Sequence, residues 1–80
     1  MRAELGLEPA FGEVLKQYRT AACLSQEKLA LEAGLDRTFI SLLERGRRQP
    51  TLTTLVLIAE ALGQPPERLL ADTLARLRRA

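Results

Sequence analysis

The stretch from Ser25 to Gly46 most constrains how this 80-residue chain can fold. Apolar residues recur within it at helical spacing, on both sides of Gly34. Ser25 and Asp36 are residue types that cap helix N-termini, and Gly34 suits the left-handed backbone that ends a helix. The stretch therefore predicts two short helices, from about residue 25 to 33 and from about 36 to 45, with a tight turn between them.

Two helices joined by about three to four residues with a glycine in the turn form the helix-turn-helix unit of DNA-binding domains. If Ile40 and Leu43 face the core, the outer face of the second helix carries a strip of five residues: Arg37, Thr38, Ser41, Leu42 and Arg45. Arginine can donate two hydrogen bonds to guanine, and hydroxyls can reach base edges or phosphates. A solvated polar face on an ordinary helical hairpin explains the strip equally well, so the strip alone leaves both interpretations open.

The net charge of +2 says little by itself, but the charged residues are unevenly distributed. Between residues 37 and 52 the sole acid is Glu44, and it stands among four arginines: Arg37, Arg45, Arg47 and Arg48. Three more arginines follow residue 72, where the chain has no further acid. A basic patch set apart from acids is typical of proteins that bind nucleic-acid phosphates.

Several function classes are disfavoured by what the sequence contains. Cys23 is the sole cysteine and there is no histidine, so we expect no disulfide, no Cys/His metal site and no cofactor. The dispersed carboxylates do not converge on a catalytic site, and no small-molecule ligand is evident, so we do not expect an enzyme. The first ten residues lack the apolar core of a signal peptide, and no run is long enough to span a membrane. A cytoplasmic protein is expected.

An all-α fold is predicted for the whole chain. The aromatic content is only 4% against 46% hydrophobic residues, which favours a core of leucine and alanine between packed helices. Further helices are predicted over residues 9–22, from Thr51 or Thr53 to Leu62, and from Pro66 to about Arg78. The result is a compact five-helix bundle, with residues 1–8 as a flexible N-terminal arm and 9–80 as a single domain.

Several separated segments of the sequence agree in register with one known family. They are Arg19, residues 24–30 (LSQEKLA), Ala33 with Gly34, residues 40–46 (ISLLERG), Pro50, Leu55, Ala59, residues 62–63 (LG) and 69–70 (LL). With these residues the chain resembles the Cro/repressor-type (XRE-like) helix-turn-helix domains, over roughly residues 11–70. The resemblance implies a lambda repressor-like fold that binds double-stranded DNA and regulates transcription, as repressors of this family do.

The resemblance also implies roles for individual residues. Base contacts are implied for the residues at the start and middle of the second motif helix, Arg37, Thr38 and Ser41. Contacts to the DNA backbone are implied for Gln26, Arg45, Arg47 and Arg48. Arg19 and Glu44 match a pair that family members use as an internal salt bridge. Leu42 and Phe39 are left without a defined role.

The string from Asp36 to Ser41 is also similar to the recognition helix of controller proteins from restriction–modification systems, which are short dimers. We expect a homodimer on a palindromic operator, with Leu74 and Leu77 in the interface, because an apolar stripe on a small domain tends to mark a contact surface. Packing of these leucines against the first helix is the alternative. The alternative function is a protein-interaction module of the same fold, such as an antitoxin or an accessory subunit.

Overall fold

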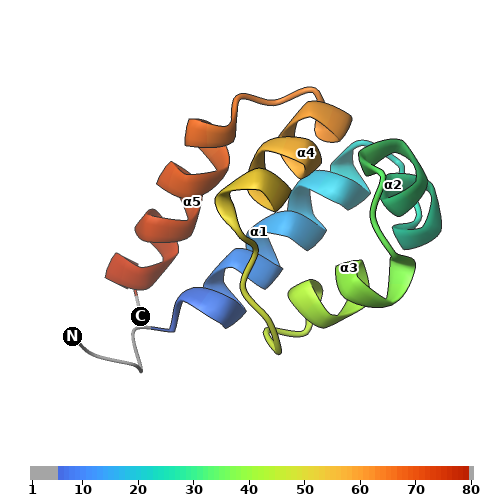
Figure 1. The fold of residues 1–80 in the computed structure, drawn as a ribbon. Coiled ribbons are helices and arrows are strands. Elements are labelled where there is room, and N and C mark those ends of the chain that lie inside the picture. Colours follow the sequence, from blue (N-terminus) through green and yellow to red (C-terminus); the bar gives the residue numbers. More distant parts are fainter. Residues whose placement is uncertain (1–5, 80) are drawn as a thin grey trace.

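A computed structural model describes residues 6–79, and within them the chain forms five helices and no strand (Figure 1). The helices are α1 (Leu7–Ala21), α2 (Gln26–Ala33), α3 (Arg37–Glu44), α4 (Leu52–Leu62) and α5 (Pro66–Arg79). The prediction of an all-α fold with five helices is confirmed. Helix α1 begins at Leu7, two residues earlier than predicted, and residues 1–5 of the predicted arm lie outside the described residues.

Helix α1 lies in the middle of the molecule and contacts α3 on one side and α5 on the other, while α4 packs against α2 and α5 (Figure 1). The core between them is aliphatic. Its larger side chains with no exposed surface are those of Val14, Leu15, Leu29, Ile40, Leu43, Ile58 and Leu69. Burial of one such side chain contributes roughly 1.5–3 kcal/mol, so helices this short are held mainly by tertiary packing.

Side-chain caps begin three of the helices. The Ser25 hydroxyl accepts a hydrogen bond from the Lys28 amide at 3.0 Å at the start of α2. The Thr51 hydroxyl accepts one from the Thr54 amide at 3.0 Å, so Thr51 rather than Thr53 caps α4. Each such cap satisfies a backbone donor that the helix itself leaves free.

Gly12 is buried where α1 crosses α3. A Cβ atom at this position would lie 2.5 Å from the carbonyl oxygen of Leu43 and 2.7 Å from that of Glu44. Judged by helix propensity alone, Gly12 would weaken α1 slightly. The structure gives the residue a positive role, because the absence of a side chain lets the two helix backbones approach closely.

Polar contacts attach α5 to α1. The Tyr18 hydroxyl donates a hydrogen bond to the Asp72 carboxylate, and Arg76 pairs with Glu13 at 2.9 Å. The Thr73 hydroxyl is buried and donates to the Leu69 carbonyl at 2.8 Å. None of the described helices is long and apolar enough to cross a membrane.

Candidate nucleic-acid interface

Residues 34–36 form the turn between α2 and α3. Gly34 has a φ of 71°, and the Leu35 amide donates to the Ala30 carbonyl at 2.8 Å, which closes the C-terminus of α2. The Asp36 carboxylate then accepts a hydrogen bond from the Thr38 amide at 2.9 Å and starts α3. The C-terminus of α2 and the N-terminus of α3 therefore lie where the sequence predicted them.

The two faces of α3 differ sharply in exposure. Ile40 and Leu43 have no exposed surface, whereas Arg37 and Thr38 are exposed and Ser41 is half-buried. These three residues begin at the helix N-terminus, where partial positive charge and free N–H groups favour anions. The face predicted to contact bases is thus open to solvent at its N-terminal end.

The two residues of α3 without a predicted role are both half-buried. Phe39 packs against the apolar core, so its ring supports the fold. Leu42 accepts a hydrogen bond from the Arg47 amide through its backbone carbonyl, at 2.9 Å. That bond belongs to the closure of the C-terminus of α3.

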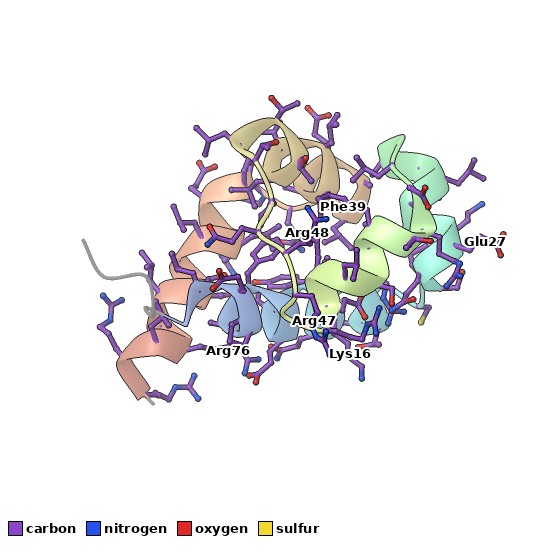
Figure 2. The ribbon with its side chains drawn as sticks, turned by 60° about the horizontal axis from the view of Figure 1, so that its bottom comes forward. Lys16, Glu27, Phe39, Arg47, Arg48 and Arg76 are labelled. Atoms are coloured by element: carbon purple, nitrogen blue, oxygen red, sulfur yellow. The ribbon has the colours of Figure 1, made fainter. Side chains whose placement is uncertain are left out.

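The loop of residues 45–51 leaves α3 and passes the start of α1. Gly46 has a φ of 73°, and a Cβ there would lie 2.9 Å from Cα of Pro9. The Gln49 side chain donates to the Glu8 carboxylate at 2.9 Å, and this bond lowers the pKa of Glu8. Arg47 and Arg48 project from this anchored loop and are exposed (Figure 2).

The arginines of this surface keep their charges available. Within residues 6–79 the salt bridges involve the basic side chains of Arg19, Lys28 and Arg76. None of these salt bridges involves the four arginines of α3 and the loop that follows it: Arg37, Arg45, Arg47 and Arg48. All four are exposed. An uncompensated basic surface beside a helix N-terminus is suited to bind phosphates.

Glu44, the one acid in this region, faces inward to Arg19. The two side chains form a bidentate ion pair, with Nε to Oε2 at 2.5 Å and Nη2 to Oε1 at 3.0 Å. Arg19 also donates to the Leu24 carbonyl at 2.7 Å. The hydrogen bond to Glu44 raises the pKa of Arg19 despite partial desolvation. This is the pair that the resemblance implied, and it cancels the charge of Glu44 beside the basic surface.

Gln26 is hydrogen-bonded to the same ion pair, and the sequence did not predict this contact. It is the first residue of α2, is half-buried, and donates from Nε2 to Oε1 of Glu44 at 3.0 Å. The two residues are 18 positions apart, and no local pattern predicts that they meet. The side chain implied to contact a phosphate is therefore tied to the interior salt bridge.

The two leucines predicted for a dimer interface differ in environment. Leu74 is 38% exposed, whereas Leu77 is half-buried and its Cδ2 would lie 3.5 Å from a Cβ at Gly6. Leu77 therefore packs near the start of α1.

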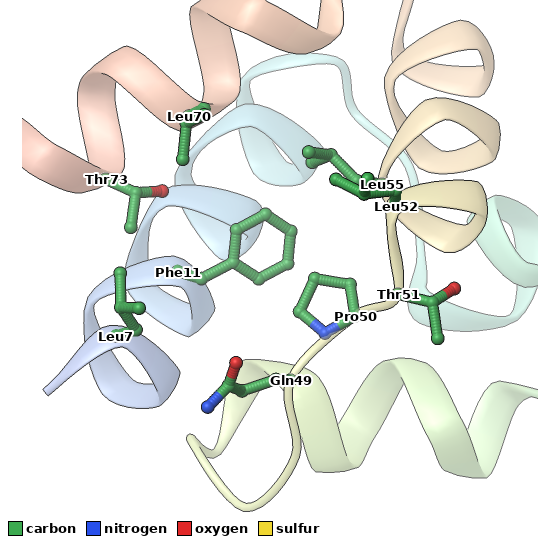
Figure 3. Close-up of a pocket in the computed structure, with 9 residues that line it drawn as sticks. All are labelled: Leu7, Phe11, Gln49, Pro50, Thr51, Leu52, Leu55, Leu70 and Thr73. Atoms are coloured by element: carbon green, nitrogen blue, oxygen red, sulfur yellow. The ribbon is translucent and has the colours of Figure 1, made fainter. Parts of the chain in front are cut away.

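Other apolar side chains lie open on α4 and α5. Leu52 is 81% exposed, Leu70 45% and Val56 40%. Leu52 and Leu70 line a cavity of about 150 Å³ together with Phe11, Pro50 and Leu55 (Figure 3). Leu52 and Val56 line a neighbouring depression. We call the exposed residues Leu52, Val56, Leu70 and Leu74 the apolar patch.

No cluster of metal-ligating side chains is present in the part of the chain that the structure describes.

A family model described as helix-turn-helix matches residues 15–69, which include α2, α3 and most of the core. The chain belongs to the helix-turn-helix family. This confirms the resemblance inferred from the sequence, and the function class is that of a DNA-binding transcriptional regulator, not of an enzyme family.

This helix-turn-helix protein is similar to several controller proteins. It is 46% identical over 64 residues to control protein C.BamHI of Bacillus amyloliquefaciens, covering 79% of each chain. It is 39% identical over 66 residues to control protein C.SmaI of Serratia marcescens, covering 82% of this chain and 79% of that one. The crystal structure of the restriction-modification controller protein C.AhdI from Aeromonas hydrophila superposes with a TM-score of 0.75 at 41% identity, covering 85% of this chain and 98% of that chain.

Proposed function

We propose that this protein is a sequence-specific regulator that inserts α3 into the major groove of double-stranded DNA and acts without catalysis. The observation that carries the proposal is the basic surface that runs from the N-terminus of α3 to the loop 45–51, with no salt-bridge partner among the described residues. A helix N-terminus and a flanking basic loop match the two kinds of contact, to base edges and to phosphates.

The contacts divide between these two kinds. Arg37, Thr38 and Ser41 are proposed to reach base edges, because they share the outer face of α3. Phosphate contacts are proposed for Gln26 at the start of α2 and for the three arginines at and after the end of α3, Arg45, Arg47 and Arg48. Relatives named as control proteins support a role in regulating restriction–modification genes.

A homodimer is part of the proposal. One α3 reads only a few base pairs, and a two-fold dimer whose α3 helices lie about 34 Å apart would match a palindrome. The apolar patch supports this, because contiguous apolar surface on a small domain marks an interaction site. Leu74 stays in the proposed interface. We add the exposed residues Leu52, Val56 and Leu70 to it, and we give Leu77 a smaller part because its side chain is less exposed.

The test is a titration of duplex DNA over a series of salt concentrations, with a random-sequence selection to identify the preferred site. We expect log K to fall linearly with log salt, with a slope near −0.9 for each neutralised phosphate. Arg47→Ala should weaken binding to every duplex alike and flatten the slope by roughly one. A wild-type protein that binds no duplex at low salt would remove the proposal and leave a protein-interaction module.

Arg37→Ala is the matched comparison in the same titration, since both variants remove one exposed arginine. The loss should amount to roughly 1–3 kcal/mol on the preferred site and far less on unrelated duplexes, because a base contact carries sequence information and a phosphate contact does not. Equal losses on all duplexes would assign Arg37 to the DNA backbone.

A further inference from the structure

Three helices contribute to one hydrogen-bonded cluster at the inner edge of the DNA-facing unit. Arg19 of α1, Gln26 of α2 and Glu44 of α3 meet there, with Glu44 between the other two. The Glu44 side chain is only 4% exposed. Its Oε2 accepts from Arg19, while Oε1 accepts from both Arg19 and Gln26.

We propose that Glu44 is a positioning residue that holds the Gln26 carboxamide in one orientation for contact with a DNA phosphate. This inference rests on the proposed function. An ionised carboxylate can only accept hydrogen bonds, so the NH₂ end of the Gln26 amide must face Glu44. One N–H of the amide nitrogen is used in that bond. The second N–H on the same nitrogen can donate a hydrogen bond to a phosphate oxygen.

The orientation matters because the two ends of the amide act oppositely on a phosphate. The NH₂ end donates, whereas the carbonyl oxygen repels a phosphate oxygen. A glutamine free in solution samples many rotamers and presents either end. By holding Gln26 in advance, Glu44 removes part of the ordering cost of binding, which is the general effect of preorganisation.

Arg19 makes this arrangement compatible with DNA. An unpaired carboxylate at the end of α3 would repel the phosphate backbone next to Arg45 and Arg47. The bidentate pairing with Arg19 supplies a compensating positive charge from the interior side. The net charge of the Arg19–Glu44 pair is therefore close to zero, and Glu44 can orient the Gln26 amide without repelling the DNA backbone.

A double-mutant cycle tests the inference on a short duplex at low salt, at a temperature where circular dichroism shows every variant folded. The variants are Gln26→Met, which keeps side-chain length without the amide, Glu44→Gln, and both together. In the wild-type background Gln26→Met should weaken binding roughly tenfold, as expected for one hydrogen bond to a charged group. In the Glu44→Gln background Gln26→Met should weaken binding by no more than about twofold, because an amide at position 44 can both donate and accept and no longer fixes the orientation of the Gln26 amide.

Ile58→Val is the control for loss of stability alone. Ile58 is fully buried in α4 and lies outside the cluster, so this variant should lower the melting temperature and leave duplex binding unchanged. Equal effects of Gln26→Met in both backgrounds, or no effect in either, would overturn the inference while wild-type binding stands. Absence of wild-type binding would remove the proposed function and this inference together.

A second measurement needs no Glu44 variant and covers the case in which Glu44→Gln does not fold. In the free wild-type protein, NMR should show the two side-chain N–H protons of Gln26 exchanging with solvent at clearly different rates, because one is bonded to Glu44. Gln64, which lies in the connection between α4 and α5, serves as the internal reference. If the exchange rates of the two Gln26 amide protons differ no more than those of Gln64, the inference is contradicted.

Discussion

Gly12 shows how a single residue can be misread when only its own helix is considered. In a helix interior glycine is less favourable than alanine by roughly 0.8–1.0 kcal/mol, so the sequence marks it as a weakness. The structure reverses this, because the carbonyl oxygens of Leu43 and Glu44 occupy the space that a Cβ would need. The contact between α1 and α3 determines how Gly12 affects stability, and helix propensity does not reveal that contact.

Gly12→Ala is expected to destabilise the fold by roughly 1–3 kcal/mol net, since the overlap is with backbone atoms that cannot move independently. Chemical denaturation would measure the change. Lys16→Ala, at an exposed position of the same helix, should change the free energy of unfolding by no more than about 0.5 kcal/mol. A Gly12→Ala variant as stable as the wild type, or more so, would show that α1 and α3 can separate at little cost.

The residues of the candidate interface were predictable to different degrees. The exposure of Arg37, Arg47 and Arg48 follows from helical spacing and from a loop rich in arginine. The pairing of Arg19 with Glu44 came from the family resemblance rather than from spacing. The bond of Gln26 to Glu44 was not predicted, because it depends on how the end of α3 meets the start of α2. Cys23, with a φ of 61°, was likewise not expected in a left-handed conformation.

At the scale of helices, the quality of a predicted boundary follows the chemistry of its cap. The starts of α2 and α3 were predicted because Ser25 and Asp36 are strong capping residues whose side chains do bond the backbone. The start of α1 was missed because its N-cap is Gly6, in a left-handed conformation and without a side-chain hydrogen bond. The predicted start was residue 9, a proline, which is a residue type that favours the first helical position, but in the structure Pro9 is the third residue of α1.

Tyr18 offers a direct probe of the contact between α1 and α5. Its hydrogen bond to Asp72 raises the pKa of the phenol above the ordinary value near 10, outweighing the opposite effect of Arg68. The neutral phenol is thus favoured in the folded protein, so the stabilisation is complete below about pH 10 and is lost as pH rises through the raised pKa.

The chain has one tyrosine and no tryptophan, so absorbance at alkaline pH reports Tyr18 alone. We expect the midpoint of tyrosinate formation above pH 10 in the wild type and closer to 10 in Asp72→Asn, which removes the negative charge facing the phenol. Circular dichroism at each pH would establish that the protein is still folded. Identical midpoints in the two proteins would show that α5 does not hold this contact in solution.

At the scale of the whole molecule, the sequence predicted Leu74 and Leu77 of α5 as an interface, and of these two leucines only Leu74 is exposed. Leu69 is fully buried, Leu77 packs near Gly6, and Leu70 and Leu74 stay exposed. The exposed side chains of α4, Leu52 and Val56, were not assigned, because helical spacing does not reveal how two helices share a surface. The apolar patch spans both helices.

The proposed dimer is tested by Leu70→Glu combined with Leu74→Glu. Charges on the apolar patch should yield a folded monomer that binds the operator much more weakly, because a charged group buried at an interface is strongly unfavourable. Sedimentation would measure the mass and circular dichroism the fold. Leu31→Glu is the control, since Leu31 is 75% exposed but belongs to α2, on the opposite side of the molecule from α5 (Figure 1). A wild-type monomer at high micromolar concentration would exclude the dimer.

The division of α3 into a buried and an open face has a consequence for how such a protein diversifies. Its position depends on Ile40, Leu43 and the close backbone contact at Gly12, whereas Arg37 and Thr38 point away from all of these. Substitutions at exposed positions commonly change stability by no more than about 0.5 kcal/mol. With Arg37 and Thr38 as the proposed base contacts, target preference could be changed, by evolution or by engineering, almost independently of folding, and one fold could serve many operators.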